Sequence, residues 1–239
     1  MCSSDLAHEI RNPLVSIGGF ARRIAKLVEP NSPLRGYVEV IQEEVTRLEK
    51  LLREILDFTG ENLSYYGDHD LGKLLEDTLI LVQRDLDANK IKLVREFALL
   101  PRLHCDDRQM KQVFYNLFQN AIQAMPQGGA LTIRTYPVER ADGLYAAAAI
   151  SDTGGGIPME VLHNIFNPFF STKDYGTVLG LAISQRIISR HYGQIEVNNE
   201  IGKGVTFIVT LPVAKYCLVK DVGQGAVPAS VLRPPKGGR

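Results

Sequence analysis

The sequence predicts an α+β protein in which a helical hairpin, expected to form a dimeric four-helix bundle, is followed by a two-layer α/β sandwich. Three observations predict this fold class. Two stripes of apolar residues at helical spacing lie near the start of the chain, and a short turn-like sequence separates them. Beyond residue 70, helical patterns are mixed with stretches that favour strands of an antiparallel-leaning sheet.

The two stripes predict the helices of a hairpin that we place at residues 6–60. In the first stripe apolar residues recur at intervals of four and three, as on one helix face, at Leu6, Ile10, Leu14, Ile17, Ala21, Ile24 and Val28. Residues 29–33 have the composition of a turn. The second stripe keeps the same pattern over about three heptads, at Leu34, Val38, Ile41, Val45, Leu48, Leu52 and Ile55. One hairpin buries two such stripes poorly, so we expect a homodimer through the hairpin.

The rest of the chain predicts a polar linker at residues 61–70 and a second domain at residues 71–212. In this domain the patterns predict helices over residues 71–88, 109–125 and 179–191, and strands over residues 91–97, 131–136, 145–151, 194–198 and 205–211. Residues 213–239 turn to Gly, Pro and Val without periodicity, which predicts a disordered tail.

The composition excludes some classes of function. Lys plus Arg equals Asp plus Glu, 27 each, so the charge balance gives no sign of a nucleic-acid partner. No apolar run approaches the roughly 18 residues of a membrane helix, and no signal peptide is present. The three cysteines, Cys2, Cys105 and Cys217, lack metal-binding spacing and predict reduced thiols in the cytoplasm.

The first five residues, Met1–Asp5, have the sequence that a common sequencing adapter would encode, and we interpret them as a cloning or sequencing scar. On this hypothesis the natural protein continues upstream, where a membrane anchor can lie. The missing part of the first helix then predicts a weaker dimer than in the parent.

The sequence His8-Glu9-Ile10-Arg11-Asn12-Pro13 carries reactive groups at the start of the first helix. At about 100° per residue, His8 points away from the apolar stripe, and a neutral imidazole there is a competent nucleophile. Glu9 can orient the ring or take its proton, and Asn12 reaches the same space one turn on. A lone helical histidine is more often a surface or core residue without a chemical role. Motifs later in the chain must therefore show whether His8 is reactive. Four further histidines lack such neighbours and are interpreted as structural or exposed: His69, His104, His163 and His191.

Two later motifs indicate a nucleotide site. Asn116 and Asn120 share a helix face, and Mg²⁺ prefers such oxygen ligands together with phosphates and water. Asp152 follows a predicted strand, where its carboxylate can accept a hydrogen bond from the adenine amine. Gly154 and Gly156 allow the backbone to approach the base. Each motif alone is weak, since exposed asparagines and Gly-rich turns are common. No Walker motif is present, because no Gly-Lys-Ser/Thr follows.

A lid is expected to begin at residues 167–173, where paired phenylalanines anchor it or enter the core and Lys173 meets phosphate charge. The next helix offers its N-terminus to phosphates, through Gly176, Thr177, Val178, Leu179, Gly180 and Leu181. A last Gly-rich stretch covers residues 202–207.

In this order, the motifs resemble the transmitter core of a bacterial two-component sensor histidine kinase of the nitrogen-regulation-like class, over about residues 6 to 212. The resemblance rests on the phosphoacceptor sequence at residues 8–13, the N box at residues 116–121 and glycine boxes at residues 152–158 and 202–207. It implies a Bergerat-type ATP-binding fold, with ATP and Mg²⁺ as cofactors. It also implies a response-regulator receiver domain as partner.

The resemblance also implies residue roles. His8 would be phosphorylated, Glu9 would be its acid/base partner, and Asn12 would position water when the kinase dephosphorylates its response regulator. Asn120 would bind the metal, and Ile157 and Thr206 would line the nucleotide site with the residues above.

Val178 departs from the family, which usually has glycine there. A β-branched residue restricts the backbone and crowds the phosphates, so ATP affinity or lid closure can be weakened. Two alternatives stay open: a nucleotide-binding scaffold or inactive truncated kinase, and a Bergerat-fold ATPase that forms no phosphohistidine.

Overall fold

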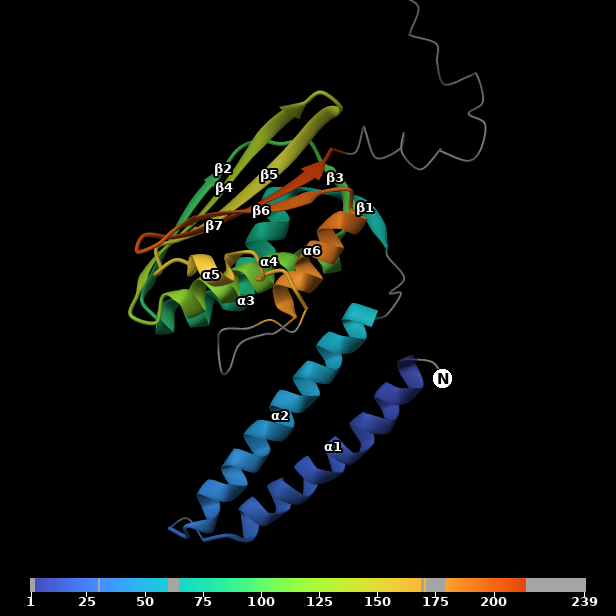
Figure 1. Ribbon diagram of the computed structural model, residues 1–239, viewed down its shortest axis with the longest axis vertical. Helices are drawn as coiled ribbons and strands as arrows, with labels where there is room; N and C mark the ends of the chain where they lie inside the picture. Colours follow the sequence, from blue (N-terminus) through green and yellow to red (C-terminus); the bar gives the residue numbers. More distant parts are fainter. Residues whose placement is uncertain (1–2, 30, 60–64, 169, 171–178, 214–239) are drawn as a thin grey trace, which may run out of the picture. The chain divides into compact units, whose positions relative to one another are not determined.

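The computed structural model describes residues 3–29, 31–59, 65–168, 170 and 179–213. The chain divides into two compact units, one containing a helical hairpin and the other a β-sheet (Figure 1). Among the described residues, no helix combines the length and apolar character needed to cross a bilayer.

The hairpin consists of α1, Ser3–Leu27, and α2, Leu34–Thr59, which pack against each other. Both predicted helices are therefore confirmed. Helix α1 begins at Ser3, so it includes residues that we interpreted as a scar, and Pro13 lies inside it. The helices approach each other closely at Gly18, where an added Cβ would lie 3.0 Å from Val45 Cγ1.

Only half of each apolar stripe is buried inside the hairpin. The buried positions repeat every seven residues in each helix: Leu14 and Ala21 in α1, and Val38, Val45 and Leu52 in α2. The other heptad position leaves side chains 40–59% exposed: Ile17, Ile24, Leu34, Ile41 and Leu48. A second row of apolar side chains, which we call the outer row, thus lies on the hairpin surface.

The second unit is the expected two-layer sandwich. Its sheet has the strand order β2-β4-β5-β7-β6, with bounds β2 Ile91–Phe97, β4 Gly129–Arg140, β5 Gly143–Asp152, β6 Gln194–Glu200 and β7 Gly204–Pro212. The β2–β4 pair is parallel and the other pairs are antiparallel. The helices are α3 Leu71–Ala88, α4 Asp107–Ala124, the short α5 Met159–Leu162 and α6 Gly180–Arg190. Helices α3 and α4 pack together over one face of the sheet (Figure 1).

The core of this unit forms between α3, α4 and the sheet. The apolar faces of both helices are buried, and their largest fully enclosed side chains include Phe114, Phe118, Leu75 and Leu79. Leu131 and Ile133 of β4 face the same layer and are completely buried. Burial of this extent stabilises the sandwich and fixes α4 firmly against the sheet.

Three short elements were not predicted: β1, β3 and α5. Residues 66–69 of the expected linker form β1, Tyr66–His69, which pairs antiparallel with β3, Leu103–Asp106. Both strands have only four residues, and β1 is made of polar and small residues with a half-exposed pattern. Such a strand lacks the apolar alternation by which strands are found in sequences.

Candidate functional site

His8 and Glu9 fall within α1, as the sequence predicted. The side chains of residues 3–11 lie outside the described part of the structure, so the solvent exposure of His8 stays a prediction. Asn12, one turn on, is exposed, and its carbonyl oxygen accepts a hydrogen bond from Ser16 Oγ at 3.1 Å. The phosphoacceptor sequence therefore lies on α1, and its last two residues, Asn12 and Pro13, are exposed.

Helix α4 presents Asn116 and Asn120 on the same half-buried side, opposite the apolar residues of its core face. Asn116 Nδ2 donates to Ser184 Oγ of α6 at 3.4 Å. Ser184 is fully buried. The shared face predicted for the two asparagines is confirmed, and Asn116 also connects α4 to α6.

Asp152 ends β5 and is 8% exposed. Its Oδ1 accepts backbone hydrogen bonds from Gly154 at 2.9 Å and from Val205 at 3.3 Å. These donors fix the carboxylate orientation at the strand end, where the adenine contact was predicted. They also connect β5, the following loop and β7 through one side chain.

The glycines after Asp152 lie where larger residues cannot fit. A Cβ at Gly154 would lie 2.8 Å from the carbonyl oxygen of Ala124, at the end of α4. Gly156 has φ +78°, a left-handed conformation that favours glycine, and a Cβ there would lie 2.9 Å from Glu200 O. The backbone after β5 thus passes directly over the end of α4.

Asn199 holds the same loop from β6. Its Oδ1 accepts the Ile157 N–H at 2.8 Å and its Nδ2 donates to the Ile157 carbonyl at 2.7 Å. Asn199 was not predicted, because a side chain that binds the backbone of a residue 42 positions away leaves no local pattern in the sequence. Ser184 was missed for the same reason.

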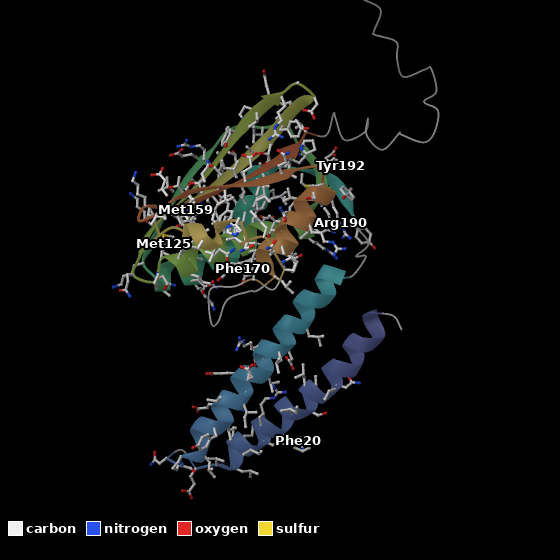
Figure 2. The ribbon with its side chains drawn as sticks, in the orientation of Figure 1. Phe20, Met125, Met159, Phe170, Arg190 and Tyr192 are labelled. Atoms are coloured by element: carbon white, nitrogen blue, oxygen red, sulfur yellow. The ribbon has the colours of Figure 1, made fainter. Side chains whose placement is uncertain are left out.

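Thr206 lies on β7 directly opposite Ser151, and their hydroxyl oxygens are 2.8 Å apart. Since Ser151 precedes Asp152, the structure brings Asp152 and Thr206 to neighbouring strands. Thr153, on the other side of Asp152, accepts the Ala130 N–H at 2.9 Å. Its hydroxyl also lies 3.6 Å from the Sδ of Met125, which Figure 2 labels. Asp152, Thr206 and the glycine loop therefore form one connected group at this end of the sheet.

The predicted lid is described only at its edges. Phe170 is half-buried, and its N–H donates to the Asn167 carbonyl at 3.2 Å. Four predicted site residues lie outside the described residues: Lys173, Gly176, Thr177 and Val178. Leu179 and Gly180 are buried and Leu181 is half-buried at the start of α6. The expected helix after the lid is therefore confirmed, while phosphate binding at its start stays a prediction.

The residues fit a nucleotide with Mg²⁺ by the chemistry of their donors. The half-buried Asn120 amide offers a hard oxygen ligand of the kind that Mg²⁺ prefers. Within the described ranges, no group of three His, Cys, Asp or Glu side chains is placed to hold a metal ion by itself. Phosphate oxygens and water would have to supply most of the ligands.

Comparison with known proteins matches two stretches of the chain to two families. The family described as the His Kinase A (phospho-acceptor) domain matches residues 2–60. The family described as the Histidine kinase-, DNA gyrase B-, and HSP90-like ATPase matches residues 105–215. Sporulation kinase C of Bacillus subtilis is 35% identical over 212 residues, which are 88% of this chain and 48% of that protein.

Two solved kinases have similar structures. Full-length ShkA in complex with AMPPNP gives a TM-score of 0.71 at 25% identity, over 88% of this chain and 45% of that one. ThkA in complex with the response regulator protein TrrA gives 0.65 at 32% identity, over 87% and 60%. The isolated catalytic domain of ThkA gives 0.56 at 31% identity, over 62% of this chain and 95% of that domain.

These matches define the class of protein: a phosphoacceptor hairpin joined to an ATPase-type catalytic domain. The chain belongs to the two-component sensor histidine kinases, of which it contains the transmitter core. It spans about half the length of the curated relative described above. The nitrogen-regulation-like subclass stays a prediction.

Proposed function

We propose that this chain is an ATP-dependent protein-histidine kinase that phosphorylates His8 and passes the phosphoryl group to an aspartate of a response regulator. The observation that carries the proposal is that one chain holds both parts. Its first helix bears His8, Glu9 and Asn12, and its sandwich joins Asp152, the glycine loop and Thr206 beside α4.

In the proposed reaction, a ring nitrogen of His8 attacks the γ-phosphorus of ATP, and the bond from this phosphorus to the bridging oxygen breaks. ADP leaves with the electron pair of that bond, and Glu9 takes the proton from the imidazole. Asp152 binds the adenine amine, while Asn116 and Asn120 face the phosphates. Mg²⁺, when bound, supplies positive charge that balances the phosphate oxygens. The protein contributes mainly position and charge.

We propose a homodimer as the working form of the chain. The outer row of the hairpin leaves five large apolar side chains at heptad spacing on the surface, and a second copy can cover them in a four-helix bundle. ThkA has been solved in complex with the response regulator protein TrrA, which supports a receiver domain as partner of this chain. Asn12, exposed one turn from His8, is the residue that we propose positions water for dephosphorylation. We place the chain in the cytoplasm, where receiver domains occur.

Labelling with γ-phosphate-labelled ATP and Mg²⁺ tests the proposal, with His8→Gln as the test variant and the exposed His163→Gln as matched control. We expect acid-labile, base-stable label on the wild type and on His163→Gln, and none on His8→Gln. Label that persists on His8→Gln contradicts the proposal.

The two alternatives give different results in the same experiment. A nucleotide-binding scaffold, the reading that Val178 supports, binds ATP and acquires no label. An ATPase without phosphohistidine releases phosphate while the protein stays unlabelled. A measured nucleotide affinity and a phosphate-release assay therefore separate all three.

A further inference from the structure

Four hydrogen bonds meet at Asp106, which is 3% exposed at the end of β3. One carboxylate oxygen, Oδ1, accepts the backbone N–H groups of Arg108 and Gln109 at 3.0 Å and 3.1 Å and so caps α4. The other oxygen, Oδ2, accepts the backbone N–H of Tyr65 at 2.9 Å. The Asp106 N–H donates to His191 Nε2 at 3.1 Å.

These bonds join three segments that are far apart in the sequence. Tyr65 directly follows residues 60–64, the stretch of chain that leads from α2 into the sandwich. Asp106 begins α4, which carries Asn116 and Asn120. His191 follows α6, is 2% exposed, and donates from Nδ1 to the Ile187 carbonyl at 2.8 Å. Asp106 therefore connects the entry of the chain into the sandwich with both helices near the nucleotide residues.

The bond to Tyr65, which we call the tether, is not needed to cap the helix. Asp70 caps α3 in the ordinary way, through Oδ1 and the Lys73 N–H at 2.9 Å, and is exposed. In Asp106 the cap uses Oδ1, so Oδ2 is available for the tether. Tyr65 is 69% exposed, so its side chain is mostly in solvent. Its backbone N–H, through the bond to Asp106, attaches the residue to the sandwich.

The tether adjoins an ordered strand. Tyr66, the next residue, pairs with Asp106 in the β1–β3 ladder. Its ring lies 5.0 Å from that of His191 and 5.7 Å from that of His104. The tether thus lies beside the β1–β3 pairing, at the residue where the described part of the domain begins.

We infer that Asp106 is a positioning residue for phosphoryl transfer, because its tether fixes where the chain from the hairpin enters the domain that holds ATP. The inference rests on the proposed function. The hairpin that carries His8 is joined covalently to the ATP-binding domain through this entry, and phosphoryl transfer depends on close alignment of the reacting atoms. A looser entry widens the range of positions that the two reactants sample, and the maximal rate falls while nucleotide binding does not.

Asp106→Asn removes the tether and keeps the cap. Asn caps helices about as well as Asp, and the two helix N–H groups hold the amide oxygen toward α4. The new amide NH₂ group then faces the Tyr65 N–H. Both groups are hydrogen-bond donors, so the bond is lost. We expect kcat for His8 phosphorylation to fall roughly five- to tenfold with an unchanged KM for ATP. The Tm should fall as well, because a hydrogen bond is lost at a buried site. Asp70→Asn is the matched control, with unchanged kcat.

A second variant removes the same bond from the other side. Tyr65→Pro deletes the N–H donor at the residue before β1, where proline is tolerated, and Tyr65→Phe keeps it. If both variants act through one bond, the double variant Asp106→Asn/Tyr65→Pro has the kcat of either single variant. Defects that multiply, or a rise in the KM for ATP in Asp106→Asn, would show a merely structural role and overturn the inference.

Amide hydrogen exchange gives a readout that does not need kinase activity. Asp106→Asn should speed exchange at residues 66–69 severalfold and leave α4 protected. Unchanged exchange refutes the tether itself. If the wild type makes no phosphohistidine, the proposed function fails and the positioning role fails with it, while faster exchange still shows the tether. If the wild type is phosphorylated and Asp106→Asn matches its rate, only the positioning role fails.

Discussion

The hairpin and the α/β sandwich bury their apolar residues in different ways. The sandwich encloses complete side chains such as Phe114, Phe118 and Leu131 between its own helices and sheet. In the hairpin only alternate heptad positions are buried, and the outer row stays on the surface. The sandwich therefore encloses its apolar side chains within one copy, whereas the hairpin keeps a row of them on its surface, which we propose that a second copy covers.

The same contrast separates the two kinds of functional residue. The sandwich holds its site residues with tertiary hydrogen bonds, as at Asp152 and Asn199. The hairpin carries the phosphoacceptor sequence on α1, and the last two residues of this sequence, Asn12 and Pro13, are exposed. This contrast suits the proposed reaction, in which His8 must meet ATP and then a separate receiver domain.

The largest effect is expected in the sandwich core. Phe118→Ala removes a fully buried ring between α4 and its neighbours, and should lower the free energy of unfolding by about 3–5 kcal/mol. Urea unfolding monitored by tyrosine fluorescence measures this loss. Tyr115→Ala, on the exposed side of the same helix, is the control. Equal losses in the two variants would show that the core described here is not what holds the sandwich together.

A smaller effect is expected at the outer row, and it should concern association. Ile41→Glu places a charge on a 45% exposed apolar position of α2, and a symmetric dimer meets it twice. We expect the dimer dissociation constant to rise at least about tenfold, since a buried unpaired charge is costly. Sedimentation equilibrium measures it, with Glu43→Gln on the same helix as control. A dimer that is as tight as the wild type would mean that the outer row is not the interface.

The pH dependence of stability should show a still smaller effect, within the sandwich. Burial lowers the pKa of His191, against the opposing influence of its hydrogen bond to the Ile187 carbonyl and of the Asp106 charge. The unfolded state therefore binds the proton more readily, and unfolding free energy falls as pH drops below about 6.5, the pKa of an unfolded histidine.

Urea unfolding at pH 7.5 and pH 5.5 measures this change. In His191→Leu the part of the pH dependence due to this ring should vanish, whatever the overall loss of stability. His163→Gln should keep the full dependence. If His191→Leu keeps the full pH dependence as well, protonation of the His191 ring is not what lowers the unfolding free energy at low pH.

The smallest effect is expected on the sheet surface. Arg134 Nε lies 2.7 Å from Glu96 Oε2, but both side chains are about half exposed. Arg134→Ala should change the unfolding free energy by less than about 1 kcal/mol, because solvent screens such pairs. Thermal melts against the wild type measure it. A loss comparable to that of Phe118→Ala would mean that this pair is far stronger than its exposure allows.

Periodicity predicted most of the fold. The heptad stripes gave both hairpin helices, and the strong apolar patterns of residues 71–88 and 91–97 gave α3 and β2 with the bounds observed. The short polar strand β1 was not predicted, because it is held by pairing with β3 and by the stacking of the Tyr66 ring near those of His104 and His191.

The candidate site residues that the sequence predicts are those that belong to short continuous motifs. The spacing within each motif is visible in the sequence, as for Asn116 and Asn120 or for Asp152 and Gly156. The structure places the first pair on α4 and the second at the end of β5 and in the loop after it. Asn199, Ser184, Asp106 and His191 act through long-range contacts, and His191 was interpreted only as structural or exposed. It is buried, with both ring nitrogens in hydrogen bonds. A side chain whose partners lie about 40 or more residues away has no signature in a single sequence.

The central claim is that the phosphoryl group of ATP moves to His8. The direct measurement is tandem mass spectrometry of the chain after incubation with ATP and Mg²⁺, digested at neutral to basic pH so that phosphohistidine survives. The account predicts one phosphoryl group on the peptide that contains His8, and its loss after brief acid treatment. A phosphoryl group on another residue, or production of ADP and phosphate with an unmodified chain, would contradict it.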